Sequence, residues 1–321
     1  METRLKLLLL SAVTLYGTIF CMADEPDFYF GALGYSIVSA SEQTCEVAVG
    51  KYNGEVVVPS EVTYSGKTFK VIGVGNSAFL DSKVKSIKLS EGIRYVREKG
   101  ISLCISLKKL TLPASLIEVE QGCFSFNSIE TLTIEDGTEP LPCDLGMYKI
   151  RPLEGNDNIL TMNIGKNVSK EFFENACNKV KMLVIGDMVT TFEPTDFPAL
   201  RTLEVGASLQ SLPYLNTGDY LSNIKVKTAE PQNAGGFNKH TYLYATLHVP
   251  AGSKSAYENA EPWKNFKEIV EYEASGIDEI VENTTRDVYD LNGRLLFKKV
   301  LSTASLPKGI YIINHKKFVK Q

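Results

Sequence analysis

The chain has 321 residues, which is long enough for two domains or for one elongated array of repeats. Apolar residues make up 44% and charged residues 22%, which excludes disorder over most of the length. The formal net charge of −4, from 34 basic and 38 acidic residues, gives no electrostatic reason to expect nucleic acid or an anionic membrane surface as the partner.

Residues 1–23 have the pattern of a secretory signal peptide. Arg4 and Lys6 precede a mostly apolar run, and Ala23 offers a cleavage point before an acidic stretch. The run is short for a membrane anchor and no later stretch is apolar enough to replace it, so we predict no transmembrane span. We expect export to the cell surface, the extracellular space or the periplasm. Lipidation at Cys21 is the alternative, and the bulky Phe20 before it is unfavourable.

The cysteines that follow the predicted signal peptide are too few for a disulfide scaffold. Their odd number leaves at least one thiol free or in an intermolecular bond. They are Cys45, Cys104, Cys123, Cys143 and Cys177.

A repeat follows, which is clearest in "SLKKLTLP" at 106–113. With Leu110 as an anchor at position 0, apolar residues stand at −3 (Leu107) and at +2 (Leu112). The same pattern recurs at steps of 20 to 23 residues, with one step of 30, and all sixteen −3 and +2 positions are apolar. These steps are typical of leucine-rich repeats. The anchors are Ile87, Leu110, Leu132, Met162, Leu183, Leu203, Ile224 and Leu247.

Strand geometry explains the spacing, since side chains at 0 and +2 point to one face and those at −1 and +1 to the other. We predict one short strand per repeat, with 0 and +2 facing inward and −3 turned back into the interior. One coil cannot bury its apolar side alone, so the coils stack and the strands pair in parallel. The predicted fold is a leucine-rich-repeat solenoid with irregular or short helical returns.

Two stretches carry a resemblance to a known family, "VIGVGNSAFLDSKVKSIKLSEGI" at 71–93 and "GISLCISLKKLTLPASLIEVEQGCF" at 100–124. They resemble the BspA-like class of bacterial surface leucine-rich repeat proteins, of the Bacteroidetes type. Ala78-Phe79 matches that family's alanine-phenylalanine pair, and Cys104 and Cys177 fall at its cysteine position.

The resemblance implies a domain order for the rest of the chain. Residues 24–70 are similar to the β-rich N-terminal cap of such proteins, and 71–272 to their repeat array with a closing cap. Within the closing unit we expect a short helix over 253–260, and Trp263, Phe266 and Ile269 covering the last coil rather than forming a ligand pocket.

The 30-residue step holds an insertion, "EDGTEPLPCDLGMYKIRPLEGNDN", at 135–158. It carries three prolines and no second strand signal, so we expect a loop that bulges from the coil. Such a loop is either functional or the result of drift.

After a polar linker at 273–286, residues 287–321 predict a small β-unit. Asn292-Gly293 between two apolar runs indicates a tight hairpin, and Pro307-Lys308-Gly309 leads into a third strand. The segment resembles a short type IX secretion sorting domain of exported Bacteroidetes proteins. A vestigial docking module is the alternative.

Catalytic chemistry has little support in the sequence. His240, His248 and His315 have no cysteine or carboxylate at metal-ligand spacing, and Cys104 and Cys177 take interior positions. No phosphate-binding loop or other catalytic motif occurs. We therefore predict no enzyme activity, no catalytic or metal-binding residues and no cofactor.

The polar residues between the inward ones remain, and they should cover one face of the solenoid sheet. We predict that this face, expected to be concave, binds a macromolecular partner. Met182 and Val184 are apolar there, and either anchor a partner or are covered by the inserted loop near Tyr148. The candidate ligand-binding residues are Lys88, Lys109, Thr111, Thr131, Thr133, Asn163, Met182, Val184, Thr202, Glu204, Lys225 and His248.

Two functions fit these features. The first is an exported, non-enzymatic recognition or adhesion protein whose sheet face binds a host or microbial protein or glycan. The second is a structural scaffold of the cell envelope without a dedicated ligand.

Overall fold

The computed structural model describes residues 25–273, 286–290, 294–300, 309–313 and 316–320. The chain divides into a first unit that ends at Val270 and a second unit over Glu271–Gln321. The predicted signal peptide, most of the linker and the hairpin turn at Asn292-Gly293 lie outside the described residues.

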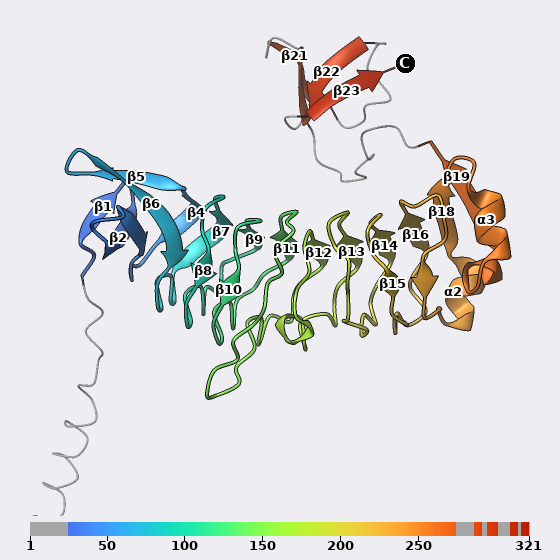
Figure 1. Ribbon diagram of the computed structural model, residues 1–321, viewed down its shortest axis with the longest axis horizontal. Helices are drawn as coiled ribbons and strands as arrows, with labels where there is room; N and C mark the ends of the chain where they lie inside the picture. Colours follow the sequence, from blue (N-terminus) through green and yellow to red (C-terminus); the bar gives the residue numbers. More distant parts are fainter. Residues whose placement is uncertain (1–24, 274–285, 291–293, 301–308, 314–315, 321) are drawn as a thin grey trace, which may run out of the picture. The chain divides into compact units, whose positions relative to one another are not determined.

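The first unit is a solenoid built on a ten-stranded sheet, confirming the predicted fold class (Figure 1). Its strands pair in parallel from β4 to β18, with the anchors in register: Leu110 lies between Ile87 and Leu132. In sheet order the strands are β4 (Asn53–Val58), β7 (Lys83–Leu89), β9 (Lys109–Leu112), β11 (Thr131–Ile134), β12 (Thr161–Ile164), β13 (Met182–Ile185), β14 (Thr202–Val205), β16 (Asn223–Val226), β18 (Thr246–Pro250) and β19 (Glu268–Tyr272).

The interior of the coils consists of the predicted inward residues. All eight anchors and all eight +2 residues are buried. Burying a side chain of this size contributes about 1.5–3 kcal/mol, so each coil is stabilised mainly by its neighbours. The −3 position is buried in seven repeats but not in the eighth, where Tyr244 is 68% exposed.

The expectation for Tyr244 was wrong because a helix precedes the eighth strand. Helix α2 (Lys239–Tyr244) begins after Asn238, whose side chain accepts a hydrogen bond from the Thr241 amide at 2.7 Å. Thr241 on this helix is buried, and so is Ala245, the first residue after the helix. Tyr244 between them is exposed to solvent.

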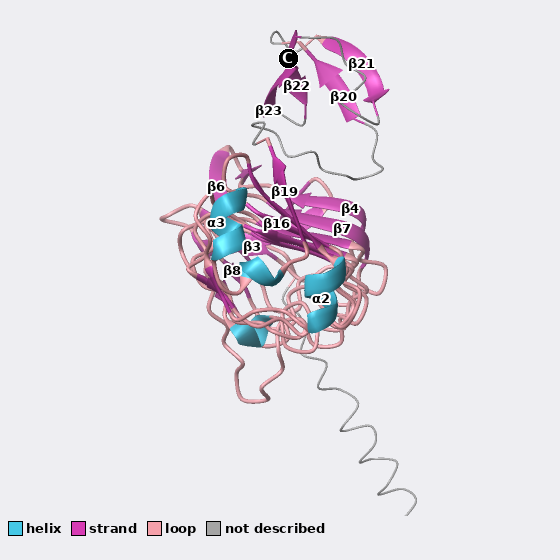
Figure 2. Ribbon diagram, turned by 90° about the vertical axis from the view of Figure 1, so that its right-hand side faces the viewer, coloured by secondary structure: helices cyan, strands magenta, loops and turns pink. Residues whose placement is uncertain are grey.

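A second sheet covers another side of the first coils (Figure 2). Its hairpin strands form the N-terminal end. From the long strand β6 the sheet continues into the repeats through the two-residue strands β8 and β10, which pair in parallel. The strands are β1 (Phe28–Phe30), β2 (Leu33–Ser39), β3 (Thr44–Val47), β5 (Glu61–Tyr64), β6 (Lys67–Val74), β8 (Tyr95–Val96) and β10 (Glu118–Val119). A smaller sheet pairs β15 (Ser211–Leu212) with β17 (Asn233–Ala234).

The insertion is a projecting loop, as expected, on the side of the coils away from the ten-stranded sheet (Figures 1 and 2). Its base is tied to the coils by bridges between Leu141 and Val168 and between Val119 and Cys143. It is followed by the 3₁₀-helix η1 (Lys170–Phe172).

Lys166, which follows the insertion, is buried inside the coils, although no sequence pattern distinguishes it. Its side chain is fully buried, and Nζ donates to the carbonyl oxygens of Ala114 at 2.7 Å and Leu116 at 2.8 Å. Burial lowers the pKa of Lys166 below its ordinary value.

The closing end of the solenoid has the expected helix, α3 (Lys254–Asn259), followed by the 3₁₀-helix η2 (Trp263–Asn265). Trp263 is fully buried and donates from Nε1 to the Gln232 carbonyl at 2.7 Å. Phe266 and Ile269 are buried beside it, so these residues cover the last coil, as predicted.

The second unit is a four-stranded antiparallel sheet in the order β21-β20-β22-β23. Val288 and Tyr311 are buried in it. Its strands, β20 (Arg286–Tyr289), β21 (Leu295–Val300), β22 (Gly309–Ile313) and β23 (Lys316–Lys320), match the predicted β-unit.

Asn127 shows what holds the returning turns together. Its side chain accepts from the Cys104 amide and donates to the carbonyls of Ile101 and Phe124, each at 2.8 Å. We expect Asn127→Ala to lower the free energy of unfolding by roughly 2–3 kcal/mol, because these buried backbone groups lose their partner. Urea unfolding followed by circular dichroism measures the change.

Asn158→Ala is the matched control for this prediction. Asn158 is exposed, and its side-chain oxygen accepts a single bond from Lys179. This variant should change the unfolding free energy by no more than about 0.5 kcal/mol. Equal losses for the two variants would contradict the role given to Asn127.

Candidate binding face

The ten-stranded sheet presents two continuous rows of outward side chains, together called the sheet face here. Because the parallel strands pair in register, equivalent residues of successive repeats lie side by side. The −1 row is Glu55, Ser86, Lys109, Thr131, Thr161, Met182, Thr202, Asn223 and Thr246. The +1 row is Val57, Lys88, Thr111, Thr133, Asn163, Val184, Glu204, Lys225 and His248.

All twelve candidate residues lie on this face, and most of them are partly accessible. Lys88 and Lys109 are exposed, and nine others are half-buried between their neighbours. Thr111 differs, because it is only 9% exposed between Lys88 and Thr133 in the +1 row. Its side chain is therefore less available to a partner than its outward position predicts.

The charge of the sheet face changes along the solenoid. Lysines gather over β7 and β9, and the next strands carry mainly threonine. In the middle, the Asn163 amide donates to the Thr133 hydroxyl at 3.2 Å. Further on, Glu204 lies 3.6 Å from the ammonium groups of both Lys225 and Lys227. The face therefore offers a basic, a neutral and a mixed-charge region.

Met182 and Val184 form a partly exposed apolar pair on β13. The alternative in which the inserted loop covers them is wrong. The loop packs on the other side of the coils, where the Tyr148 amide donates to the Gln121 side chain at 3.3 Å. Met182 and Val184 therefore remain part of the sheet face.

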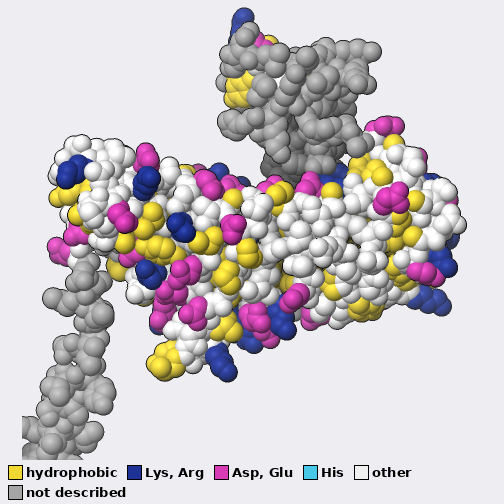
Figure 3. Space-filling model, viewed as in Figure 1, with side chains coloured by type: hydrophobic (Ala, Val, Ile, Leu, Met, Phe, Trp, Pro, Cys, Tyr) yellow, Lys and Arg dark blue, Asp and Glu magenta, His cyan; other side chains and the backbone are white. Residues whose placement is uncertain are grey.

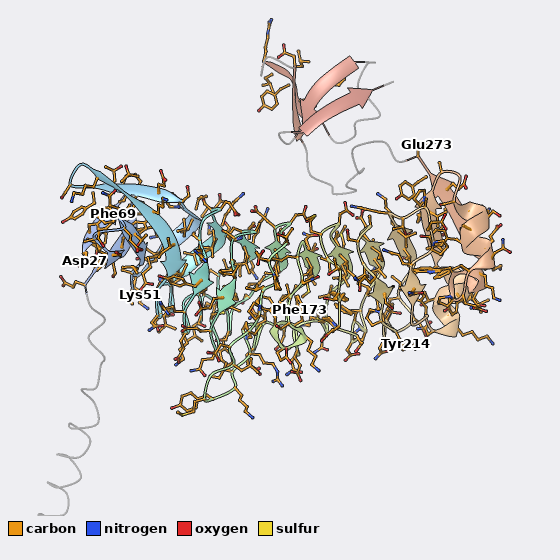
Figure 4. All side chains as sticks on the ribbon, in the orientation of Figure 1. Asp27, Lys51, Phe69, Phe173, Tyr214 and Glu273 are labelled. Atoms are coloured by element: carbon orange, nitrogen blue, oxygen red, sulfur yellow. The ribbon has the colours of Figure 1, made fainter. Side chains whose placement is uncertain are left out.

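The tip of the insertion is a second exposed apolar feature. Met147 is 86% exposed and Tyr148 is 73% exposed. Figure 3 shows hydrophobic side chains gathered at this tip. Tyr214, labelled in Figure 4, also lies away from the strands of the sheet face. These residues are separate from the candidate site.

A groove of about 940 Å³ opens at the basic end of the sheet face, over β4, β7 and β9. Sequence reasoning missed the part of it that β4 contributes, because Asn53 at −3 hides the first repeat. The signal that reveals it is Val56 and Val58 followed by Pro59, the arrangement of Leu110, Leu112 and Pro113. Its lining is Glu55, Val56, Val57, Lys85, Ser86, Ile87, Lys88, Ile105, Ser106, Lys108, Lys109 and Thr111.

The described cysteines are poor nucleophiles. Burial raises the pKa of Cys104 to about 11, and that of Cys45, Cys143 and Cys177 to about 12. At neutral pH these groups are thiols, whereas nucleophilic attack requires the thiolate.

No group of three His, Cys, Asp or Glu residues in the described parts of the chain is placed to hold a metal ion. His240 lies on helix α2, and its ring centroid is 4.5 Å from that of Tyr244. Within the described residues, no helix is long and apolar enough to cross a membrane.

Residues 72–204 match the family described as "BspA type Leucine rich repeat region", in six copies. The fold is a leucine-rich-repeat solenoid. The matched range of the solenoid runs from within β6 to within β14, and so covers the two stretches that carry the resemblance except for Val71.

Solved structures similar to the solenoid include bacterial leucine-rich proteins. A leucine rich cell surface protein from Faecalibacterium prausnitzii A2-165 is 14% identical, with 70% of each chain covered and a TM-score of 0.37. A leucine-rich repeat protein from Bacteroides ovatus ATCC 8483 is 13% identical, with 77% of this chain and 76% of that one covered and a TM-score of 0.26.

The pneumococcal vaccine antigen PcpA is 12% identical, with 77% of this chain and 98% of that chain covered and a TM-score of 0.23. No curated protein matches the sequence.

His248 provides a pH-dependent test of the sheet face. Burial lowers its pKa, the Lys225 charge adds to this, and Glu268 opposes it. The unfolded chain, with an imidazole pKa of about 6.5, then takes up the proton first, so stability falls as the pH drops below that value. We expect the imidazole to titrate below 6.5 by NMR, and His248→Gln to lose less stability between pH 8 and pH 5 than the unchanged protein.

The resonance of His248 is identified by its absence in the variant, and His240→Gln serves as the control. A midpoint at or above 6.5, or equal acid sensitivity with and without His248, would show that the ring is not desolvated on this face.

Proposed function

We propose that this chain is an exported, non-enzymatic recognition protein that binds a protein or glycan on its sheet face. The observation that carries the proposal is the pair of in-register rows, which place partly accessible polar side chains next to one another over nine strands. A solenoid provides such an extended surface without a deep pocket.

The composition of the rows supports binding. Threonine and asparagine offer donors and acceptors, the lysines and Glu204 offer charge, and Met182 with Val184 offers an apolar contact. These groups come from consecutive repeats and are held by the sheet backbone, so little conformational entropy would be lost when a partner binds.

Export is the second part of the proposal. Its support is the signal-peptide pattern of residues 1–23 and the match of 72–204 to a repeat type that the sequence shares with bacterial surface antigens. A sorting role for 287–321 rests on the resemblance of that segment alone.

A binding screen tests the first part of the proposal. We expect the purified chain without residues 1–23 to bind at least one component of an array of matrix proteins and glycans. Asn223→Arg and Lys109→Glu, both at exposed positions of the −1 row, should each weaken that binding at least about ten-fold, or roughly 1.4 kcal/mol.

Lys67→Glu, at an exposed position in β6 outside the sheet face, is the control and should leave binding unchanged. Absence of binding by correctly folded protein favours the alternative, a cell-envelope scaffold without a dedicated ligand. Under that alternative the sheet-face variants have no phenotype, whereas deletion of 287–321 has one.

Fractionation of the producing cells tests export. With an antibody against the repeats, we expect the protein in the surface or extracellular fraction, and N-terminal sequencing should begin at Asp24. Full-length protein retained in the cytoplasm would refute this part of the proposal.

A further inference from the structure

We propose that the groove over β4, β7 and β9 binds an extended acidic peptide segment of a partner protein, with an apolar side chain of that segment placed between Val57 and Ile105. This inference rests on the proposed function and names the class of partner for one end of the sheet face. It depends on the walls of the groove, its charge and its lack of aromatic rings.

Two exposed apolar side chains mark the groove. Val57, on β4, is 62% exposed and Ile105, in the return before β9, is 73% exposed. Both residues line the same cavity, and Val57 is paired in register with Lys88 on β7. Exposed aliphatic residues that share a groove with lysines favour a partner with both apolar and charged side chains.

The groove is strongly basic although the whole chain is acidic. Its lining contains four lysines and one carboxylate, that of Glu55, whereas the chain has a net charge of −4. Because opposite potentials steer and orient a partner, this region selects negative charge.

Two of these lysines have acidic neighbours within the chain. Nζ of Lys88 lies 3.2 Å from Oε1 of Glu135, and Nζ of Lys108 lies 2.9 Å from Oε1 of Glu130. Such solvent-exposed pairs contribute little to stability, so a partner carboxylate can replace them at small cost. Lys85 and Lys109 have no ion-pair partner among the described residues and are the main candidates to bind a partner carboxylate.

The lining favours a peptide over an acidic polysaccharide or a single-stranded nucleic acid. None of the described residues that line the groove is aromatic, whereas sequence-tolerant nucleic-acid sites stack bases on aromatic rings. A peptide in extended form presents alternate side chains to opposite sides, so carboxylates can meet the lysines while an apolar residue enters between Val57 and Ile105.

Fluorescence polarisation with labelled heptapeptides tests this inference on the chain without residues 1–23. The probe is Glu-Val-Glu-Leu-Glu-Val-Glu, and the control peptides replace all glutamates with glutamine or all apolar residues with serine. We expect each control peptide to bind at least about ten-fold more weakly than the probe, and binding of the probe to weaken from 50 to 300 mM salt.

Groove variants locate the binding. Lys85→Gln and Ile105→Ser, both at exposed positions, should each weaken binding of the probe at least about five-fold without lowering the melting temperature. Lys179→Gln, on an exposed residue outside the groove, is the matched control and should have no effect.

Three results would overturn the inference: equal binding of the glutamine peptide, no effect of the groove variants, or a sulfated oligosaccharide that binds through Lys85 while the probe does not. If the array partner still depends on Asn223 in any of these cases, the proposed function stands and only the groove assignment fails. If the probe binds as expected while the array is negative, the groove assignment stands without a wider recognition role for the sheet face.

Discussion

The structure depends on the stacking of equivalent apolar inward residues between neighbouring coils. A four-residue strand such as Lys109–Leu112 buries only three side chains, which cannot offset the backbone entropy that it loses on folding. Only when Ile87 and Leu132 pack on either side of Leu110, in parallel register, does the coil become stable. The repeat is therefore a requirement of folding before it has any role in binding.

The same register determines the outer surface. Since each anchor pairs with the next anchor, the residues at −1 and +1 also fall into rows, whatever their identity. The rows can then change in character along the solenoid without disturbing the interior, from lysine over β7 and β9 to threonine and then to the Glu204, Lys225 and Lys227 cluster. A fold whose inward residues stay apolar thus leaves its face free to vary.

Polar groups inside the coils have a structural role. Asn127 pairs three backbone groups of the turns, and Lys166 pairs two carbonyls beneath the insertion. Buried backbone groups require such partners where the chain leaves regular strands. A buried lysine is tolerated here because its ammonium group has two acceptors, and the 30-residue step is accommodated as a projecting loop instead of a break in the sheet.

Periodicity in the sequence was sufficient for the fold and for the direction of each strand residue, because strand side chains alternate and the anchors recur at a nearly constant step. It placed all twelve candidate residues on one face. It failed at Tyr244, where a helix shifts the inward position by one residue, and at the N-terminal end, where Asn53 hides the strand that contributes Val57. Only the tertiary structure decided that Thr111 is covered by its neighbours, that the insertion leaves Met182 and Val184 uncovered, and that Ile105 and Val57, 48 positions apart, enclose one basic groove. Each of these depends on which coils lie side by side and how their returns pack, and the spacing of residues within a single repeat carries no information about that.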